Sequence, residues 1–214
     1  MGGRRGHGRR SRILKEYSRL AAQYDSKWSF YLQATTEATL KRLTVRANDR
    51  IIDIGCGTGI LLHRLSATHA AELLAGVDPV PEMLAIARRR LSPSIPLREG
   101  WAEKLPFESE SFDIAISANM FHYIEQPVTA LHEIARVLRP GGGLIITDWC
   151  HDYPACRVID WYLRLRGRAL FRTYSEGACI RLLQETGFTV IESERYRINP
   201  LWGLMTIKAT RNAA

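Results

Sequence analysis

Three glycines at alternate positions follow a short apolar segment near residue 50. The segment reads Ile51-Ile52-Asp53-Ile54-Gly55-Cys56-Gly57-Thr58-Gly59, and a helical pattern starts at Ile60. Glycines at the end of a strand let the backbone turn tightly and approach a ligand closely. The dinucleotide pattern Gly-x-Gly-x-x-Gly is not completed, because position 60 is Ile60, and no lysine follows as in a phosphate-binding loop. The loop therefore suits a nucleoside and is poorly suited to a pyrophosphate.

Two aspartates lie where they would face such a ligand. Asp53 is at the end of the apolar strand, where its carboxylate could orient the loop and receive a cationic amine. Asp78 ends the next strand, 19 residues after Gly59, a spacing at which an acid accepts hydrogen bonds from both hydroxyls of a ribose. The alternative for each is a structural role in a solvated turn. Asp78, directly before Pro79, would be the first residue of such a turn.

Candidate acid–base residues follow the later strands. His122 comes after the apolar segment 112–118, and Asp148 and His151 lie near the end of segment 144–149. A histidine or a carboxylate at this end of a sheet can remove a proton from a substrate. We name His122 and Asp148 as the candidate catalytic residues; a packing or loop-stabilising role is the alternative for both, and the main interpretation of His151.

The cysteines do not indicate a metal site. The chain has four, Cys56, Cys150, Cys156 and Cys179, and no Cys-x-x-Cys pair. This pattern is typical of reduced thiols in a cytoplasmic protein. His151 lies between two of them, but no second ligand pair occurs at metal spacing.

Strands and helices alternate along most of the chain. Apolar segments 50–55, 72–78, 95–101, 112–118 and 144–149 predict strands, and segments 13–43, 60–65, 81–91, 128–138 and 175–186 predict helices. Segments 188–197 and 202–210 are separated by four residues, which is too short for a parallel crossover, so they predict an antiparallel hairpin. The expected fold is α/β, a Rossmann-like doubly wound sheet of seven mixed strands with this hairpin at its C-terminal edge.

These features resemble the class I S-adenosylmethionine-dependent methyltransferases, in particular the branch of ubiquinone and menaquinone biosynthesis. Beyond the glycine loop, the resemblance rests on Gly100-Trp101-Ala102-Glu103-Lys104-Leu105-Pro106-Phe107, Ser111-Phe112-Asp113 and the run from Glu133 to Gly142. It covers roughly residues 45–150 and says little about the substrate. It implies S-adenosyl-L-methionine as cofactor and no metal.

The resemblance also implies roles for individual residues. Gly55, Cys56, Gly57 and Gly59 would line the methionine and ribose part of the cofactor, Asp53 its amino group, Asp78 the ribose, Ala102 and Glu103 the adenine, and Ser117 the region near the methyl group. Two positions depart from the family pattern. Trp101 stands where an aspartate commonly contacts adenine, and Val80 stands where a small polar residue commonly caps the next helix.

Two segments outside the motifs concern the second substrate and partners. Residues 150–174 form an aromatic and basic insert, whose helix over 157–168 carries Arg157, Asp160, Arg164 and Arg168 on one side and Val158, Trp161, Tyr162 and Leu165 on another. This helix is either a cap with a solvated basic side or a lid that contacts an apolar or anionic substrate. We name Tyr17 and Tyr24, from cap helices 13–43, and Trp161 and Tyr162 as substrate candidates.

The formal charge of +8 is concentrated at the N-terminus. Residues 1–12 carry five arginines and no acid, and without these arginines the charge is +3. We expect a disordered basic tail on a single domain over 13–214, with contact between the tail, helix 157–168 and an anionic membrane as an alternative to a solvated surface. The predicted function is methylation of a small molecule, aromatic, quinone-like or lipidic. A nucleic-acid methyltransferase is disfavoured by the low charge outside the tail, and a non-catalytic cofactor-binding module is the other alternative.

Overall fold

A seven-stranded sheet in the order β3-β2-β1-β4-β5-β7-β6 forms the centre of the molecule. The computed structural model describes residues 3–166 and 172–213, apart from the side chains of residues 3–7, 9 and 164. Its strands are β1 (Ile51–Ile54), β2 (Leu74–Asp78), β3 (Leu97–Glu99), β4 (Phe112–Ala118), β5 (Leu138–Trp149), β6 (Phe188–Arg197) and β7 (Gly203–Arg211). Its α-helices are α1 (Gly3–Lys27), α2 (Ser29–Arg42), α3 (Ile60–Leu65), α4 (Pro81–Arg90), α5 (Pro127–Val137), α6 (Pro154–Leu165) and α7 (Glu176–Glu185).

The first five strands run parallel and the last two form the predicted hairpin. In the register of the central strands, Ile51 of β1 lies beside Leu74 of β2 and Ile114 of β4. β7 inserts between β5 and β6 and is antiparallel to both. This arrangement confirms the predicted α/β fold with seven mixed strands. β5 begins six residues earlier than expected, because Leu138 already pairs with Phe112 and the Pro-Gly segment after it continues the strand.

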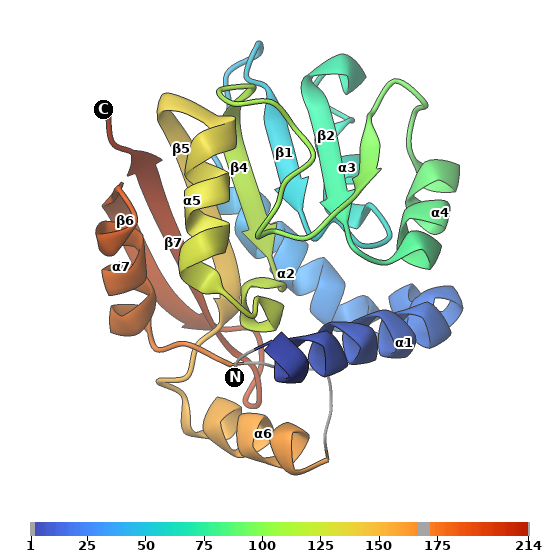
Figure 1. The fold of residues 1–214 in the computed structure, drawn as a ribbon, viewed down its shortest axis with the longest axis vertical. Helices are drawn as coiled ribbons and strands as arrows, with labels where there is room; N and C mark the ends of the chain where they lie inside the picture. The colour runs from blue at the N-terminus through green and yellow to red at the C-terminus, as the bar shows by residue number, and fades with distance from the viewer. Residues whose placement is uncertain (1–2, 167–171, 214) are drawn as a thin grey trace.

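Helices cover both faces of the sheet, so its central strands are buried. On one face, α5 and α7 place Leu131, Ile134 and Leu183 in the core. On the other face, α3 and α4 contribute Leu62 and Leu84 to a second apolar cluster. Figure 1 shows α5 and α7 in front of the sheet and α2 and α3 behind it.

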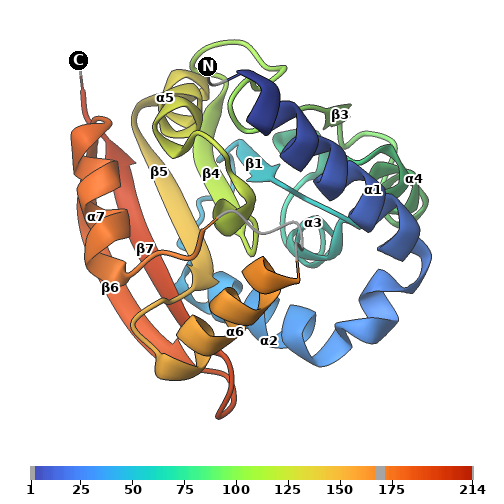
Figure 2. The ribbon, with the colours of Figure 1, turned by 60° about the horizontal axis from the view of Figure 1, so that its bottom comes forward.

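α1 and α6 lie at the end of the sheet where the parallel strands finish (Figures 1 and 2). α1 begins at Gly3, so residues 3–12 are helical here, in contrast to the predicted disordered tail. Arg10 gives a physical reason, because its guanidinium contacts the carboxylates of Glu103 and Glu125 at 3.2 and 3.6 Å. The break between the two predicted N-terminal helices falls at Trp28 instead of Asp25.

α6 packs on the fold through a different side from the one that its sequence pattern favours. Val158, Trp161 and Leu165 are 64%, 62% and 66% exposed, whereas Asp160, expected on the solvated side, is 5% exposed. The helix contacts the fold through Ile159 and Leu163, which lie against an aromatic cluster that includes Trp149 and Trp202. Within the described part of the chain, no helix combines the length and the apolar character needed to cross a membrane.

Candidate active site

The glycine loop after β1 has the backbone conformation that requires glycine. Gly55 and Gly57 have φ angles of 75° and 53°, in the left-handed region that other residues rarely adopt. A Cβ atom on Gly55 would also lie 2.8 Å from the side chain of Met120. The N–H of Gly57 donates to Oδ2 of Asp78 at 2.9 Å, so the loop is held against the end of β2. Gly59, with a φ angle of 80°, directly precedes α3, and a Cβ atom on it would lie 2.9 Å from the side chain of Leu91, which follows α4.

Asp53 and Asp78 are both buried at the ends of neighbouring strands. Burial, together with the nearby charge of Asp78, raises the pKa of Asp53 to about 7. Burial raises the pKa of Asp78 to about 6, although the N–H groups of Val80 and Gly57 donate to its carboxylate and act in the opposite direction. Two carboxylates that are costly to ionise alone are suited to a ligand that carries positive charge and hydroxyl groups.

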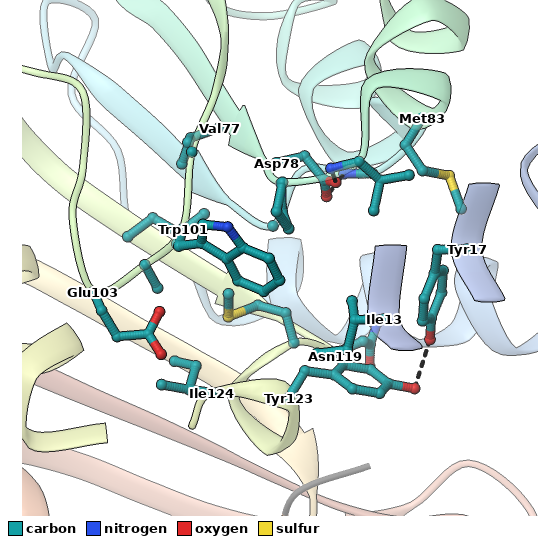
Figure 3. A pocket seen from close by; sticks show the side chains of 18 of the residues that line it. Ile13, Tyr17, Val77, Asp78, Met83, Trp101, Glu103, Asn119, Tyr123 and Ile124 are labelled. Carbon is teal, nitrogen blue, oxygen red and sulfur yellow. Dashed lines mark hydrogen bonds between the residues drawn. The ribbon is translucent and has the colours of Figure 1, made fainter. Parts of the chain in front are cut away.

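A cavity next to the glycine loop, which we call the loop cavity, collects most of the residues predicted to bind the cofactor. Its wall includes Gly55, Gly57, Asp78, Trp101, Ala102 and Glu103. Figure 3 shows the Trp101 ring extending into this cavity near Asp78, with Ile13 and Tyr17 of α1 across from it. A smaller cavity that also borders the glycine loop adds Asp53 and Cys56 and shares Tyr24 and Asn119 with the loop cavity.

α1 is fastened over the loop cavity at two points. Near its start, Arg10 lies 4.9 Å from the centre of the Trp101 ring and pairs with Glu103. Near its end, Asp25 accepts hydrogen bonds from Arg90 of α4 and from Thr58 of the glycine loop, at 2.5 and 2.7 Å. α1 therefore encloses the cavity and contacts the loop directly.

A second cavity of about 400 Å³, which we call the aromatic cavity, lies beside the loop cavity. The two share Tyr17, Tyr24, Asn119 and Tyr123. The aromatic residues on its wall come from α1, α2, α6, the ends of β4 and β5 and the start of β7: Tyr17, Tyr24, Trp28, Tyr31, Tyr123, Trp149, Tyr162 and Trp202. Its size and lining are those of a site for a small, largely apolar molecule.

His122 and Asp148 form a buried pair at this cavity. Nδ1 of His122 lies 2.5 Å from Oδ1 of Asp148, and the backbone N–H of His122 donates to Oδ2 at 3.0 Å. Each residue is at most 3% exposed, and His122 is on the cavity wall. The structure thus brings together the two residues named as catalytic candidates.

Three other candidates lie elsewhere. Ser117 is fully buried in β4 and lines none of the three cavities, whereas its neighbour Ala118 lines the smaller one. His151 bonds to Thr173, away from the aromatic cavity. Trp161 faces solvent, while its neighbour Tyr162 reaches the cavity wall, because successive helical residues point about 100° apart.

Sequence reasoning missed Asn119, which lies where the cavities meet. Its φ is 59°, its amide oxygen accepts from Tyr31 at 2.7 Å, and its amide nitrogen donates to Thr35 at 2.8 Å. The hydroxyl of Tyr31 in turn accepts from the Trp149 indole at 2.5 Å. An asparagine directly after a strand was an available signal, since it tolerates the left-handed conformation. Among the described residues, no group of three or more His, Cys, Asp or Glu side chains is arranged to hold a metal ion.

Known proteins match both the sequence and the fold. A family described as a methyltransferase domain matches residues 52–146. An O-methyltransferase of Pyrenophora dematioidea is 30% identical over 185 residues, covering 81% of this chain and 67% of that protein. A demethylmenaquinone methyltransferase of Chlorobaculum tepidum is 36% identical over 108 residues, covering 50% of this chain and 44% of that protein.

The match in fold extends over almost the whole chain. A Haloferax volcanii methyltransferase, solved in complex with a methyltransferase activator, aligns with a TM-score of 0.81 over 92% of this chain and 98% of that one, at 21% identity. The chain spans half or less of the length of the first curated relatives, 50% of one and 37% of the next. The family match and the Pyrenophora O-methyltransferase, of which this chain covers 67%, agree with the glycine loop and its two aspartates. This chain belongs to the class I S-adenosylmethionine-dependent methyltransferases.

Proposed function

We propose that this enzyme methylates a small molecule that binds in the aromatic cavity and is aromatic, quinone-like or lipidic. The observation that carries the proposal is the shared wall of the two cavities, through Tyr17, Tyr24, Asn119 and Tyr123. A cofactor in the loop cavity and an acceptor in the aromatic cavity would meet at these residues. Two relatives support the proposal: one is named an O-methyltransferase, and the other is named for demethylmenaquinone, a quinone-like acceptor.

The residues of the loop cavity fit S-adenosylmethionine. Asp78 would accept hydrogen bonds from the ribose, Trp101 offers a flat surface to the adenine, and Asp53 would face the methionine amine. Burial raises the pKa values of both aspartates, and the positive charges of this cofactor would stabilise their ionised forms. When bound, the cofactor supplies a methyl group that its positively charged sulfur already activates.

The chain then has to align the acceptor and exclude water. Tyr17 of α1 donates a hydrogen bond to Tyr123 at 2.5 Å, across the boundary between the cavities (Figure 3). The two helices α1 and α6 cover the strand ends there (Figure 2). Holding the reacting atoms about 3 Å apart in a fixed orientation supplies much of the rate of such a displacement.

The proposal is tested by incubating the enzyme with a cell extract and methyl-labelled cofactor, followed by mass spectrometry. We expect label in a small molecule, and much less label with the Asp78→Asn variant at a limiting cofactor concentration. Label found in nucleic acid would support the nucleic-acid alternative. Cofactor binding without any labelled product would support a non-catalytic module.

We also propose that α6 contacts an anionic membrane when the acceptor is lipidic. Val158, Trp161 and Leu165 present an exposed apolar surface on this helix, beside the cavity residue Tyr162. The net charge of +8 favours an anionic surface. Of the arginines predicted to take part, Arg168 and the side chain of Arg164 lie outside the described part of the structure.

A further inference from the structure

We infer that the acceptor reacts through a hydroxyl group and that His122 is the base that removes the hydroxyl proton. This inference rests on the proposed function, since it concerns the molecule in the aromatic cavity. It assigns a reacting group to an acceptor that the family membership leaves open.

The hydrogen bonds around Asp148 determine which nitrogen of His122 carries the proton. The carboxylate accepts from the backbone N–H groups of His122 and Trp149, at 3.0 and 2.6 Å, and lies 2.5 Å from Nδ1. An ionised carboxylate can only accept, so Nδ1 donates and the neutral ring has its lone pair on Nε2. The Trp149 ring stacks on the imidazole of His122, with 5.1 Å between the ring centres and an angle of 20° between the ring planes. This stacking helps to fix the orientation of the imidazole.

Nε2 is a buried acceptor to which no described residue donates a hydrogen bond. Among the residues that the structure describes, it has no hydrogen-bond partner, although His122 is 3% exposed and lies on the cavity wall. Buried polar atoms in folded proteins are nearly always hydrogen-bonded. A hydroxyl donor on the bound molecule would satisfy this atom, and a neutral imidazole is the correct form for receiving its proton.

The other titratable groups facing His122 are poorly placed to act as this base. Burial raises the pKa values of Tyr17, Tyr24 and Tyr31, so these phenols stay protonated at neutral pH. Tyr123 is adjacent to His122, and its hydroxyl accepts the hydrogen bond of Tyr17. The charged residues on the cavity wall are Glu16 and Lys27, both on α1.

The same wall disfavours an amine acceptor. Asp148 is the carboxylate nearest the His122 ring, and its oxygens already accept three N–H groups of the protein. A neutral amine attacks through its own lone pair and loses its proton only after the methyl group has been transferred, so its methylation depends less on a buried His–Asp pair. A hydroxyl needs the proton removed, because the neutral oxygen is a weak nucleophile.

The reaction balances with the groups named. The acceptor oxygen forms a bond to the methyl carbon as the carbon–sulfur bond breaks, and the electron pair of that bond remains on sulfur. The hydroxyl proton moves to Nε2, and Asp148 stabilises the imidazolium that results. The proton passes to solvent after the methyl ether leaves.

The first test identifies the methylated atom. The extract experiment is repeated with an isotope-labelled methyl group, and the NMR chemical shift of that group in the product is measured. We expect a methyl bonded to oxygen. A methyl on nitrogen or carbon would overturn the inference while leaving the proposed function intact, whereas no labelled small molecule would count against the proposed function itself.

The second test uses His122→Asn on the identified acceptor. The asparagine amide can still donate to Asp148 in place of Nδ1, but nothing replaces Nε2. We expect kcat to fall by about 10²- to 10⁴-fold, and the variant to lose the dependence of kcat on pH that a histidine base would give the wild type. His132→Asn, an exposed site on α5, is the matched control and should behave as the wild type.

Two binding measurements separate catalysis from folding. Cofactor affinity of His122→Asn should stay within about threefold, whereas acceptor binding in the presence of S-adenosylhomocysteine should weaken, because the hydroxyl loses its partner. Asp148→Asn should also lower kcat. The asparagine NH₂ group can donate to Nδ1, which places the imidazole proton on Nε2, and Nε2 then cannot accept the proton of the hydroxyl. Wild-type kcat and an unchanged pH profile in either variant would show that the pair is structural.

Discussion

Replacing Asp78 by asparagine should weaken cofactor binding far more than it weakens folding. The carboxylate offers one oxygen to Gly57 and the other to Val80, each at 2.9 Å from the backbone nitrogen. Asparagine has the same shape but only one acceptor, so its NH₂ group would face one of these N–H donors. The loop and the ribose would then compete for a single oxygen.

The expected loss follows from the charge of the carboxylate. A hydrogen bond to a charged group contributes about 1.5–3 kcal/mol, which corresponds to an increase of about 10- to 150-fold in the dissociation constant. The unfolding free energy should change less. Burial raises the pKa of Asp78 to about 6, so at pH 8 the wild-type charge opposes folding, and removing it offsets the lost hydrogen bond.

The assay is calorimetric titration with S-adenosylmethionine and S-adenosylhomocysteine at pH 8, beside thermal unfolding of the cofactor-free protein. Asp113→Asn is the matched control, because Asp113 also accepts a backbone N–H, from Arg50, but at the opposite end of the parallel strands. An unchanged dissociation constant in folded Asp78→Asn would refute the reasoning and mean that another group holds the ribose.

Three further predictions concern other parts of the site. The pKa of Asp53 is raised to about 7, so the contribution of Asp53 to stability is fully present below about pH 4 and is lost as the pH rises through 7. Cofactor affinity should rise over the same pH range. Denaturation and calorimetric titration should show both trends flattened in Asp53→Asn. Arg10→Ala should speed cofactor dissociation several-fold in stopped-flow experiments, because Arg10 fastens α1 to Glu103, whereas Arg12→Ala, at an exposed position, should not. Trp161→Glu should reduce binding to anionic liposomes and leave cofactor affinity unchanged; equal liposome binding would mean that the exposed side of α6 only faces solvent.

The fold was predictable because its signals are local in the sequence. Most of the parallel strands contain a short apolar run, and the five residues between β6 and β7 are too few for a crossover. Asp78 could be located from its spacing to the glycine loop, since the two must meet at the ends of neighbouring strands. Such patterns depend on backbone geometry and do not require knowledge of side-chain packing.

α6 shows where this reasoning fails. The larger apolar side of the helix contains Val158, Trp161 and Leu165, and periodicity alone would bury it. The structure instead packs the narrower side, with Ile159 and Leu163, against aromatic residues from two distant segments. The sequence of a helix does not specify which surface the helix will contact. Which of two apolar sides becomes buried therefore depends on surfaces that form only when the chain folds.

The same limit explains why the acceptor is harder to infer than the cofactor. The residues of the loop cavity that were predicted to bind the cofactor come from the ends of β1 and β2 and the segment after β3, whose positions the sheet order fixes. The aromatic cavity is completed by α1, α2, α6 and the start of β7, which are far apart in the chain. Asp148 and Trp149 show how closely these contributions are coupled. They lie opposite Met205 and Leu204 in the register of β5 with β7, and both contact His122. The β6–β7 hairpin therefore supports the residues that hold His122 and helps to define the acceptor site, although it supplies few of the side chains of that site.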